Sequence, residues 1–381
     1  MRNLSAQDDR FRGAFGILEK AISARAFPAC SLAITLRGEL IAHKALGRFT
    51  YDTASSEVTT GSLFDLASLT KVVATTAMAM ILYERGLLDL EAPASAIVPE
   101  FSGALFAGAT NDNDPRRNEI TLRMLLAHSS GLPAYERLSL RAHTREGLLQ
   151  AAFSTALADA PGVHAEYSDI GFIVLGVVLE RLADEPLDAF CQREIFGPLG
   201  MTHTTFNPTL ALKQFIPPTS DDRTFRQRII QGEVQDENAS VLGGIAGHAG
   251  LFSTAEDLAI FAHAMLSGGY PILRPETVEL FSRRESSPEG TSRALGWDTP
   301  SSSLPVPLPS QSGKYFSARS FGHLGYTGTS LWIDPDRQLS ITVLTNRTWP
   351  DCANQAIKQV RPAFHDAVIE ALAAGGEIGA P

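Results

Sequence analysis

The spacing of apolar residues predicts a helix near the start of the chain, followed by two paired strands. Within residues 8 to 26, apolar side chains recur every three or four positions, at Phe11, Phe15, Leu18 and Ile22. That period places them on one face of an amphipathic helix. The next stretch, ACSLAITLRGELIAHKALG, has two short apolar runs on either side of Arg37-Gly38-Glu39, which indicates a β-hairpin.

The far end of the chain shows the same two kinds of element. Residues 329 to 347 contain two apolar runs around an Asp-Pro-Asp turn, and residues 353 to 374 are expected to form a closing helix. Helical spacing dominates the middle of the chain, at 70 to 85, 120 to 128, 145 to 158, 169 to 183, 187 to 196 and 254 to 267. The last of these helices opens with Ser253-Thr254-Ala255-Glu256, the pattern of a capping box.

These patterns predict an α+β protein in which one domain is discontinuous. An antiparallel sheet built from residues 1–63 and 271–381 would carry the terminal helices, and residues 64–270 would form a mostly helical lobe. We expect the functional site at the junction between them. Stretches with the composition of loops, which often surround a binding site, occur at 101 to 119, 206 to 240 and 284 to 320.

Composition narrows the classes of function. The 381 residues carry a formal net charge of −10, with a pI near 5.4. A nucleic-acid backbone would meet no basic surface, so we expect no nucleic-acid partner. The three cysteines, Cys30, Cys191 and Cys352, form no CxxC pair, and the nine histidines show no HExxH spacing. We therefore expect no metal site and no disulfide framework.

Membrane and secretory signals are not predicted. The longest apolar run, from Gly171 to Leu179, is about nine residues long, whereas a membrane span needs roughly 18 or more. Residues 1 to 20 are charged and amphipathic and lack the apolar core of a signal peptide. We expect a cytoplasmic protein, or a periplasmic or secreted one if a leader has been removed.

The first candidate for chemistry is Ser68-Leu69-Thr70-Lys71, within FDLASLTKVV. If Ser68 begins a helix, Lys71 lies on the same face almost one turn later. The helix dipole would favour negative charge on Ser68 Oγ, and burial would favour the neutral amine of Lys71. This combination makes a serine nucleophile with an activating amine. The alternative is a polar helix start beside a lysine whose stem lies on apolar surface.

The second candidate is Tyr167-Ser168-Asp169, immediately before a predicted helix. A phenol becomes a base only where cationic neighbours lower its pKa from about 10, and Lys71 is a candidate neighbour. Asp169 would either orient Lys71 or cap the helix. The alternative is a capped helix with a tyrosine at its boundary.

The third candidate is FGHLGYTG, residues 321 to 328, just before the C-terminal hairpin. Its glycines at 322, 325 and 328 would let a ligand approach a strand backbone closely. His323 would donate a hydrogen bond to a carboxylate or carbonyl of a substrate. The alternative is a glycine-rich turn that enters an edge strand.

The order SxxK, YxD and HxG along the chain resembles the penicillin-recognising serine hydrolases: class C β-lactamases, DD-peptidases and the related serine carboxylesterases. Supporting stretches extend over roughly residues 10 to 370, among them ITLRMLLAHSSGLP (120 to 133) and GGIAGHAGLFSTAEDLAIFAHAML (243 to 266). The resemblance implies the β-lactamase/transpeptidase-like fold, with an antiparallel sheet of about five strands, terminal helices and an inserted helical lobe. It also implies that no cofactor is needed.

The same resemblance assigns catalytic roles residue by residue. Ser68 matches the acylated nucleophile, Lys71 matches its activating partner, and Tyr167 matches the tyrosine that shuttles the proton. The oxyanion hole of the family uses two backbone N–H groups, which here would be those of Ser68 and Tyr326. Preorganised donors of this kind stabilise the charge that develops in acyl transfer.

The expected substrate-binding residues depart from the family pattern at three positions. Asp169 replaces the usual Asn, so an amide that can donate becomes an acceptor whose charge would tend to hold Lys71 protonated. His323-Leu324-Gly325 matches a Lys-Thr-Gly triad, in which the histidine removes a permanent cation and the leucine removes a hydroxyl. These changes fit an esterase or a peptidase-like hydrolase better than a dedicated β-lactamase.

The leading interpretation is a metal-free serine hydrolase that forms an acyl-enzyme on Ser68 and acts on a small ester, β-lactam or peptide-like substrate. One alternative is a D-amino-acid-specific peptidase, and another is a penicillin-binding sensor module that is acylated without turnover. A Ser-His-Asp triad through His128 or His248 is disfavoured, because no G-x-S-x-G sequence surrounds any serine. The sequence leaves the physiological substrate and the oligomeric state open.

Overall fold

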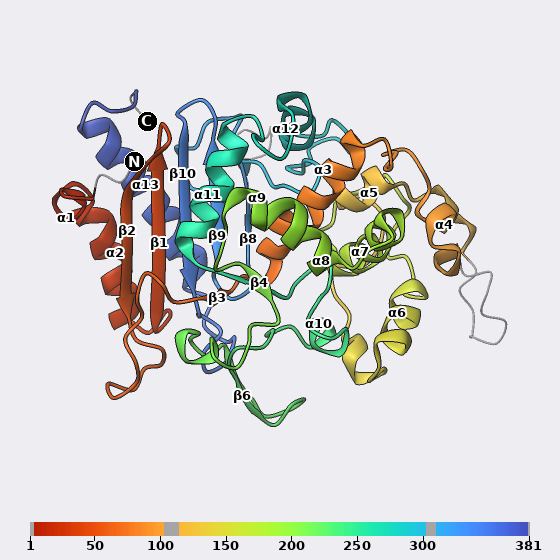
Figure 1. The fold of residues 1–381 in the computed structure, drawn as a ribbon, viewed down its shortest axis with the longest axis horizontal. Coiled ribbons are helices and arrows are strands. Elements are labelled where there is room, and N and C mark those ends of the chain that lie inside the picture. The colour runs from red at the N-terminus through yellow and green to blue at the C-terminus, as the bar shows by residue number, and fades with distance from the viewer. Residues whose placement is uncertain (1–3, 103–113, 302–309, 380–381) are drawn as a thin grey trace.

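The computed structural model describes residues 4–102, 114–301 and 310–379. Its centre is a five-stranded antiparallel sheet in the order β2-β1-β10-β9-β8 (Figure 1). The strands come from both ends of the chain: β1 Ala29–Leu36, β2 Glu39–Gly47, β8 Phe321–Leu324, β9 Ser330–Asp334 and β10 Leu339–Thr345. The predicted α+β fold, with an antiparallel sheet of about five strands, is confirmed.

The alternation of residues along β1 decides what covers each face of the sheet, because successive side chains point to opposite faces. Every second residue from Cys30 to Leu36 is apolar and packs with α2 (Arg12–Ser23) and α13 (Ile357–Ala374). On the other face Ala33 belongs to the core that includes α11 (Ala255–Leu266). The terminal helices therefore cover one face of the sheet, as the sequence predicts, and α11 covers the other (Figure 1).

The remaining helices lie mainly beside the sheet, on the right in Figure 1. They are α3 Ala77–Glu84, α4 Ala94–Ile97, α5 Leu122–Leu126, α6 Arg145–Phe153, α7 Asp169–Ala183, α8 Leu187–Cys191, α9 Gly197–Leu199, α10 Glu237–Val241 and α12 Pro275–Ser282, with α1 Gln7–Arg10 at the N-terminus. Two π-helical turns occur at Lys71–Thr76 and Gln192–Phe196. Helix α7 is apolar on almost every side and is the buried centre of this part, which is typical of a core helix.

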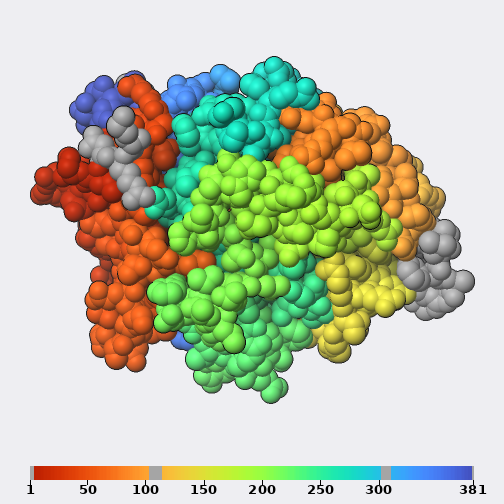
Figure 2. All heavy atoms as spheres, in the orientation of Figure 1, coloured from red at the N-terminus to blue at the C-terminus, as the bar shows by residue number. Residues whose placement is uncertain are grey.

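Short strands connect the sheet and the helices. β3 (Phe64–Asp65), β7 (Leu251–Ser253) and β4 (Thr205–Phe206) form a three-stranded sheet, and β5 (Ser220–Asp222) pairs with β6 (Arg228–Ile230). In Figure 2 the green segment around β4 to β6 runs across the middle of the visible face, between the orange first strands and the yellow helices.

Several predicted boundaries are corrected by the structure. The stretch 206 to 240, expected to be a loop, contains β5, β6 and the start of α10. The predicted helix 145 to 158 ends at Phe153. Helix α11 is capped by Thr254, one residue after the predicted capping serine, and the Thr254 hydroxyl accepts from the Asp257 N–H.

Other sequence predictions remain untested by the fold. Residues 103–113 and 302–309, from the predicted loops 101 to 119 and 284 to 320, lie outside the described residues. The division into residues 1–63 plus 271–381 and residues 64–270 stays a prediction. Among the described helices, none is long and apolar enough to cross a membrane.

A glycine contact brings the chain before β7 against α7. Gly176 of α7 and Gly247 lie so close that a Cβ on Gly247 would stand 2.9 Å from Gly176 Cα and nearer still to the Phe172 carbonyl oxygen. Thr75 Oγ1 donates to the Gly247 carbonyl at 2.6 Å. The next residue is His248, whose carbonyl contacts a candidate site residue, so this packing positions part of the site.

Replacing Gly247 with Ala is expected to destabilise the fold by about 1 to 3 kcal/mol, because overpacking in a tight contact forces the backbone to shift. Urea unfolding measures the change. Gly16→Ala is the control, since a Cβ added there in α2 meets nothing within 4 Å and Ala is preferred to Gly inside a helix by roughly 0.5 to 1 kcal/mol. Equal unfolding midpoints for the two variants would contradict the packing argument.

Candidate active site

Ser68 lies in a short 3-10 turn, Ala67–Leu69, directly after β3. Ala67 adopts a left-handed conformation with φ of 46°, which costs of order 1 to 3 kcal/mol for a residue with a Cβ. The Asp65 carboxylate accepts from the Ala67 N–H at 2.8 Å and holds this turn. The predicted helix over 70 to 85 therefore starts as a 3-10 turn, continues as a π-helical turn from Lys71 and becomes α-helical at Ala77.

The structure brings Ser68, Lys71 and Tyr167 together. Ser68 Oγ lies 2.6 Å from the Tyr167 hydroxyl and 3.1 Å from Lys71 Nζ. Lys71 Nζ also lies 4.9 Å from the centroid of the Tyr167 ring. A hydroxyl, an amine and a phenol thus share one set of contacts, although Tyr167 is 99 residues from Ser68 in the sequence. Ser68 Oγ thus has a phenol and an amine within hydrogen-bond distance, as a serine nucleophile requires.

Asp169 joins this group through the start of α7. Its Oδ1 accepts from Lys71 Nζ at 2.6 Å and from the Tyr167 hydroxyl at 3.0 Å. The cap of α7 is Ser168, whose Oγ accepts from the Gly171 N–H at 3.0 Å. Of the two roles that the sequence left open for Asp169, the structure therefore favours contact with Lys71.

Lys71 is fully buried and has three oxygen neighbours. Besides Ser68 and Asp169, the backbone carbonyl of His248 accepts from Nζ at 2.9 Å. Burial lowers the pKa of Lys71 from its usual value, and the Asp169 carboxylate opposes that shift. The three acceptors around the buried amine therefore oppose the effect of burial on its pKa.

Tyr167 is a neutral phenol in this environment. Burial, and after it the charge of Asp169, raises the pKa of Tyr167 well above its usual value. A role for Tyr167 as a base would require cationic neighbours that lower its pKa. Arg293 is one such neighbour, with its guanidinium 5.6 Å from the ring centroid, but its effect on the pKa is smaller than that of burial.

The strand β8 places His323 and Leu324 beside the same group. Burial, and then the charges of Lys71 and Arg293, lowers the pKa of His323 well below its usual value, so the ring is neutral. Its Nδ1 donates to the Leu324 carbonyl at 2.8 Å. Nε2 is then an acceptor, so this tautomer cannot donate to a substrate carboxylate as the sequence suggested.

Gly325 and Tyr326 begin the turn between β8 and β9. A Cβ on Gly325 would lie 2.5 Å from the Leu66 carbonyl oxygen, so only glycine lets this turn approach the segment that carries Ser68. The hydroxyls of Thr327 and Thr329 donate to the carbonyls of Asp65 and Leu66, at 2.8 and 3.0 Å. These bonds hold the turn that carries Tyr326 against the segment that leads to Ser68.

A cavity of about 1070 Å³ opens onto these residues. Its walls include Ser68, Tyr167, Asp169, His323, Leu324 and Gly325. Ligand sites commonly measure some 300 to 1,000 Å³, so the cavity can take a substrate considerably larger than a short-chain ester. The predicted site residues other than Lys71, which is fully buried behind Ser68, therefore line one large cavity.

Two arginines that the sequence analysis did not single out form part of the cavity wall. Arg347 follows β10, and Arg361 lies on α13; both are nearly fully buried. Among the described residues, neither forms an ion pair with a carboxylate, and Arg361 Nε has no hydrogen-bond partner. Burial, and then the charge of Arg347, lowers the pKa of Arg361 to about 9. This wall is electrostatically suited to an anionic group.

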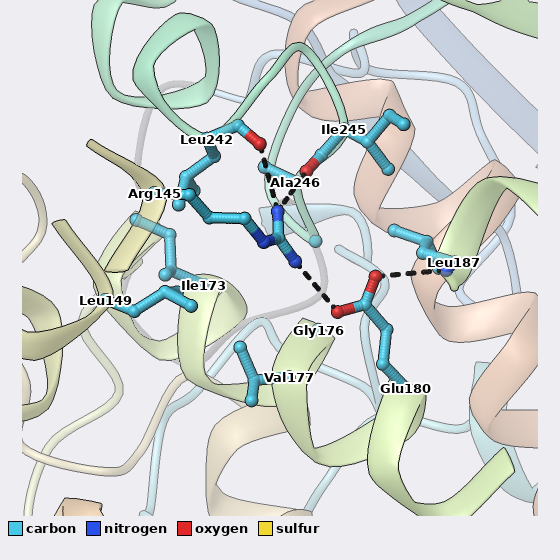
Figure 3. A pocket seen from close by; sticks show the side chains of 11 residues that line it. Arg145, Leu149, Ile173, Gly176, Val177, Glu180, Leu187, Leu242, Ile245 and Ala246 are labelled. Carbon is cyan, nitrogen blue, oxygen red and sulfur yellow. Dashed lines mark hydrogen bonds and ion pairs between the residues drawn. The ribbon is translucent and has the colours of Figure 1, made fainter. Parts of the chain in front are cut away.

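A second, much smaller cavity lies between α6, α7 and the segment before β7. Figure 3 shows Arg145 donating to the Leu242 carbonyl and pairing with Glu180, at 2.9 and 3.0 Å. Its volume is about 10 Å³, enough for about one water molecule. Arg145 thus links α6 to α7 through the ion pair and to the segment before β7 through its hydrogen bond to Leu242, and the cavity has no room for a substrate.

The histidines do not form a triad with Ser68. His128 Nδ1 accepts from the Ser168 N–H at 3.0 Å, and His248 Nε2 contacts Asp236 at 2.8 Å. The side-chain hydrogen bonds of Ser68 Oγ are to Lys71 and Tyr167 within the described part of the chain. Across the same residues, no cluster of three or more His, Cys, Asp or Glu side chains is placed to hold a metal ion.

Sequence reasoning missed the contribution of His248 and of the two arginines. His248 acts through its backbone carbonyl, for which a side-chain motif gives no signal. The arginines stand 20 or more residues after HxG, in TNR and in the closing helix. For Arg361, the signal available in the sequence was its charge, because it lies in a helix that is expected to pack on the sheet.

The Beta-lactamase family model matches residues 15–362 of the chain. Two bacterial relatives carry the name putative D-alanyl-D-alanine carboxypeptidase. The one from Escherichia coli O157:H7 is 33% identical over 351 residues, covering 84% of this chain and 79% of the relative. The one from Salmonella typhimurium is 31% identical over 364 residues, covering 87% and 81%.

Solved structures share the fold. EstCE1, a hydrolase with promiscuous acyltransferase activity, aligns with a TM-score of 0.74 at 23% identity, covering 96% of this chain and 100% of EstCE1. Simvastatin synthase (LovD) from Aspergillus terreus gives 0.72 at 22% identity, with 94% and 98% covered. At these identities the likeness establishes the fold alone. The family model and the carboxypeptidase relatives together show that the chain belongs to the Beta-lactamase family.

Proposed function

We propose that the chain is a serine hydrolase that forms an acyl-enzyme on Ser68 and acts on small esters or amides. The observation that carries this proposal is the position of Ser68 Oγ, 2.6 Å from the Tyr167 hydroxyl and 3.1 Å from Lys71 Nζ, at the wall of a large cavity. The family and its relatives mark the chain as a hydrolase. The contacts of Ser68 support this proposal, because a nucleophilic hydroxyl needs a neighbouring group through which its proton can leave.

In the proposed reaction, Ser68 Oγ attacks the substrate carbonyl carbon and releases an alcohol or amine. The oxyanion would bind the N–H groups of Ser68 and Tyr326. Within the described residues, the Tyr326 N–H has no hydrogen-bond acceptor of its own, which leaves it available for that role. Water then attacks the acyl-enzyme and frees the acid. Removing a single donor from such an oxyanion hole typically costs about 10²- to 10³-fold in rate.

A second candidate is cleavage of a D-amino-acid peptide that ends in a carboxylate. The specific observation in its favour is the buried pair Arg347 and Arg361, which among the described residues has no carboxylate partner and faces the same cavity as Ser68. A substrate carboxylate would supply the missing counter-charge. The names of the bacterial relatives agree with this candidate. His323 is neutral, so the arginines would replace the cation expected at that position of the Lys-Thr-Gly triad.

Ser68→Ala is expected to abolish covalent labelling and to lower kcat for p-nitrophenyl butyrate by at least about 10³-fold, as loss of a nucleophile typically does. Intact-mass measurement after mixing with a fluorophosphonate detects the adduct. Nitrocefin and a D-alanyl amide extend the assay to β-lactams and amides. An adduct on the variant equal to that on the wild type would reject Ser68 as the nucleophile.

The same samples separate a hydrolase from a sensor module. A hydrolase turns over at least one of the three substrates and loses its penicillin adduct with time. A sensor keeps the penicillin adduct and turns over none of them. Persistent acylation of the wild-type protein without turnover would therefore overturn the proposal of hydrolysis while retaining Ser68.

Arg361→Met is expected to raise KM for a D-alanyl-D-alanine peptide about tenfold or more, because a charge-assisted contact is worth roughly 1.5 to 3 kcal/mol. KM for p-nitrophenyl butyrate, which has no carboxylate, should change little. Arg319→Met is the matched control, since Arg319 is outside the cavity wall and pairs with Asp336. Equal KM changes for both substrates would show that Arg361 has a structural effect and does not bind a carboxylate.

A further inference from the structure

The Asp169 carboxylate is in a position that an amide could not fill in the same way. Its Oδ1 accepts from both Lys71 Nζ and the Tyr167 hydroxyl, at 2.6 and 3.0 Å. An ionised carboxylate only accepts hydrogen bonds. The directions of both bonds are therefore decided: Lys71 and Tyr167 are the donors, and Asp169 is the acceptor.

The direction of these bonds decides where the other protons lie. Tyr167 has one hydroxyl hydrogen, which it gives to Asp169, so in its 2.6 Å contact with Ser68 the donor is Ser68. The hydrogen of Ser68 is then used, so in the 3.1 Å contact Lys71 donates to Ser68 Oγ. Lys71 also donates to Asp169 and to the His248 carbonyl. Three donated bonds use all three hydrogens of an ammonium group.

This arrangement leaves Lys71 without a lone pair to receive the Ser68 proton. Tyr167 offers a lone pair, and its own hydrogen already points at a carboxylate. A phenol differs in one respect from the imidazole of a Ser-His-Asp triad, which can keep the proton that it receives. A phenol that accepts a second proton is a very strong acid, so it must release its first proton at the same time.

We propose that Tyr167 relays the proton of Ser68 to Asp169, which is the terminal proton acceptor, while Lys71 stays an ammonium and stabilises negative charge on Ser68 Oγ. This inference rests on the proposed acyl-enzyme at Ser68 and adds a path for its proton. It also gives the Asp of YxD a role in proton transfer, in addition to the orientation of Lys71.

As the Ser68 Oγ–C bond forms, the Ser68 proton moves to the Tyr167 oxygen and the Tyr167 proton moves to Asp169. At the same time the electron pair of the carbonyl double bond moves to the oxygen, which becomes the oxyanion. When the oxyanion collapses, the bond to the leaving group breaks, and the leaving group takes a proton back along the same path. Deacylation repeats both stages, with water in place of Ser68 as the nucleophile and Ser68 as the leaving group. The sum is ester plus water giving acid plus alcohol.

The electrostatic surroundings support this path. Burial and the charge of Asp169 raise the pKa of Tyr167, so the phenol is protonated at rest and serves only as a relay. The charge lost from Asp169 reappears on the substrate oxyanion, close to the Lys71 ammonium. Other polar, titratable and charged groups face Lys71, Tyr167 and Asp169 from the surrounding elements. They are Ser68, Tyr135, Asp236, His128, Arg293 and His323.

The decisive variant is Asp169→Asn, which keeps the shape of the side chain and removes the proton acceptor. We expect kcat/KM for p-nitrophenyl butyrate at pH 7 to fall by about 100-fold or more, the usual contribution of a general base. The variant should keep only a residual activity that rises with pH as Lys71 loses its proton.

Glu237→Gln is the matched control for the loss of a negative charge. Glu237 also lines the cavity, but the hydrogen bond of its side chain is to the Tyr135 hydroxyl, at 3.4 Å, and it contacts neither Lys71 nor Tyr167. At pH 7, kcat/KM of this variant should fall much less than that of Asp169→Asn. Thermal unfolding of both variants shows whether either change has disturbed the fold.

A mechanism in which neutral Lys71 is the base predicts the opposite result for Asp169→Asn. If neutral Lys71 were the base, removing the Asp169 charge would lower the pKa of Lys71, so kcat/KM at pH 6 to 7 would be retained or increased. That outcome would overturn the relay. Fluorophosphonate labelling of wild-type Ser68 would still support the proposed acyl-enzyme, so failure of the relay is distinct from failure of the proposed function.

A measurement on the unmodified enzyme keeps the inference testable if Asp169→Asn does not fold. Two protons move together in the relay, so kcat/KM plotted against the fraction of deuterium oxide should curve downwards. Transfer of one proton from Ser68 directly to Lys71 gives a straight line. A straight line with a substrate whose acylation limits kcat/KM would therefore reject the relay.

Discussion

The buried amine of Lys71 is the interaction on which the arrangement of the site depends. A fully buried cation that lost its partners would cost several kcal/mol, so its acceptors must be supplied by the surrounding structure. Three separate segments supply them: the turn with Ser68, the start of α7 with Asp169, and the chain before β7 with the His248 carbonyl. The tight contact of Gly247 with α7 holds the third segment at the required distance.

The sheet contributes to this site through its edge strand. The turn after β8 is fastened to the segment before Ser68 by the Thr327 and Thr329 hydroxyls, and Gly325 permits the close approach. The sheet itself is built from both ends of the chain. A site formed between β8 and the turn after β3 therefore requires the N- and C-terminal segments to have paired, which couples the geometry around Ser68 to completion of the fold.

The charges of the cavity are arranged in two parts. Near Ser68, the Lys71 cation and the Asp169 anion lie 2.6 Å apart, and their charges largely offset one another. The Arg347 and Arg361 side of the cavity has no such compensation among the described residues. We infer that the reacting carbonyl lies where charges offset, so that the charge developing during the reaction is stabilised by fixed donors. A carboxylate, where the substrate has one, would lie at the uncompensated side.

Local periodicity was enough to predict β1, β2, β9, β10 and most helices, although β5 and β6 lie in a stretch expected to be a loop. The order of three short motifs singled out Ser68, Lys71 and Tyr167. The sequence left the role of Asp169 open and could not find the Arg347 and Arg361 wall. The folded structure was needed to show that Ser168 caps α7, that the pKa of Tyr167 is raised and that His323 donates from Nδ1. The contacts of Ser168 with Gly171 and of His323 with Leu324 are local, but the sequence also allowed other local partners for these side chains. The raised pKa of Tyr167 depends mainly on burial by segments that are distant in the sequence, so no local pattern encodes it.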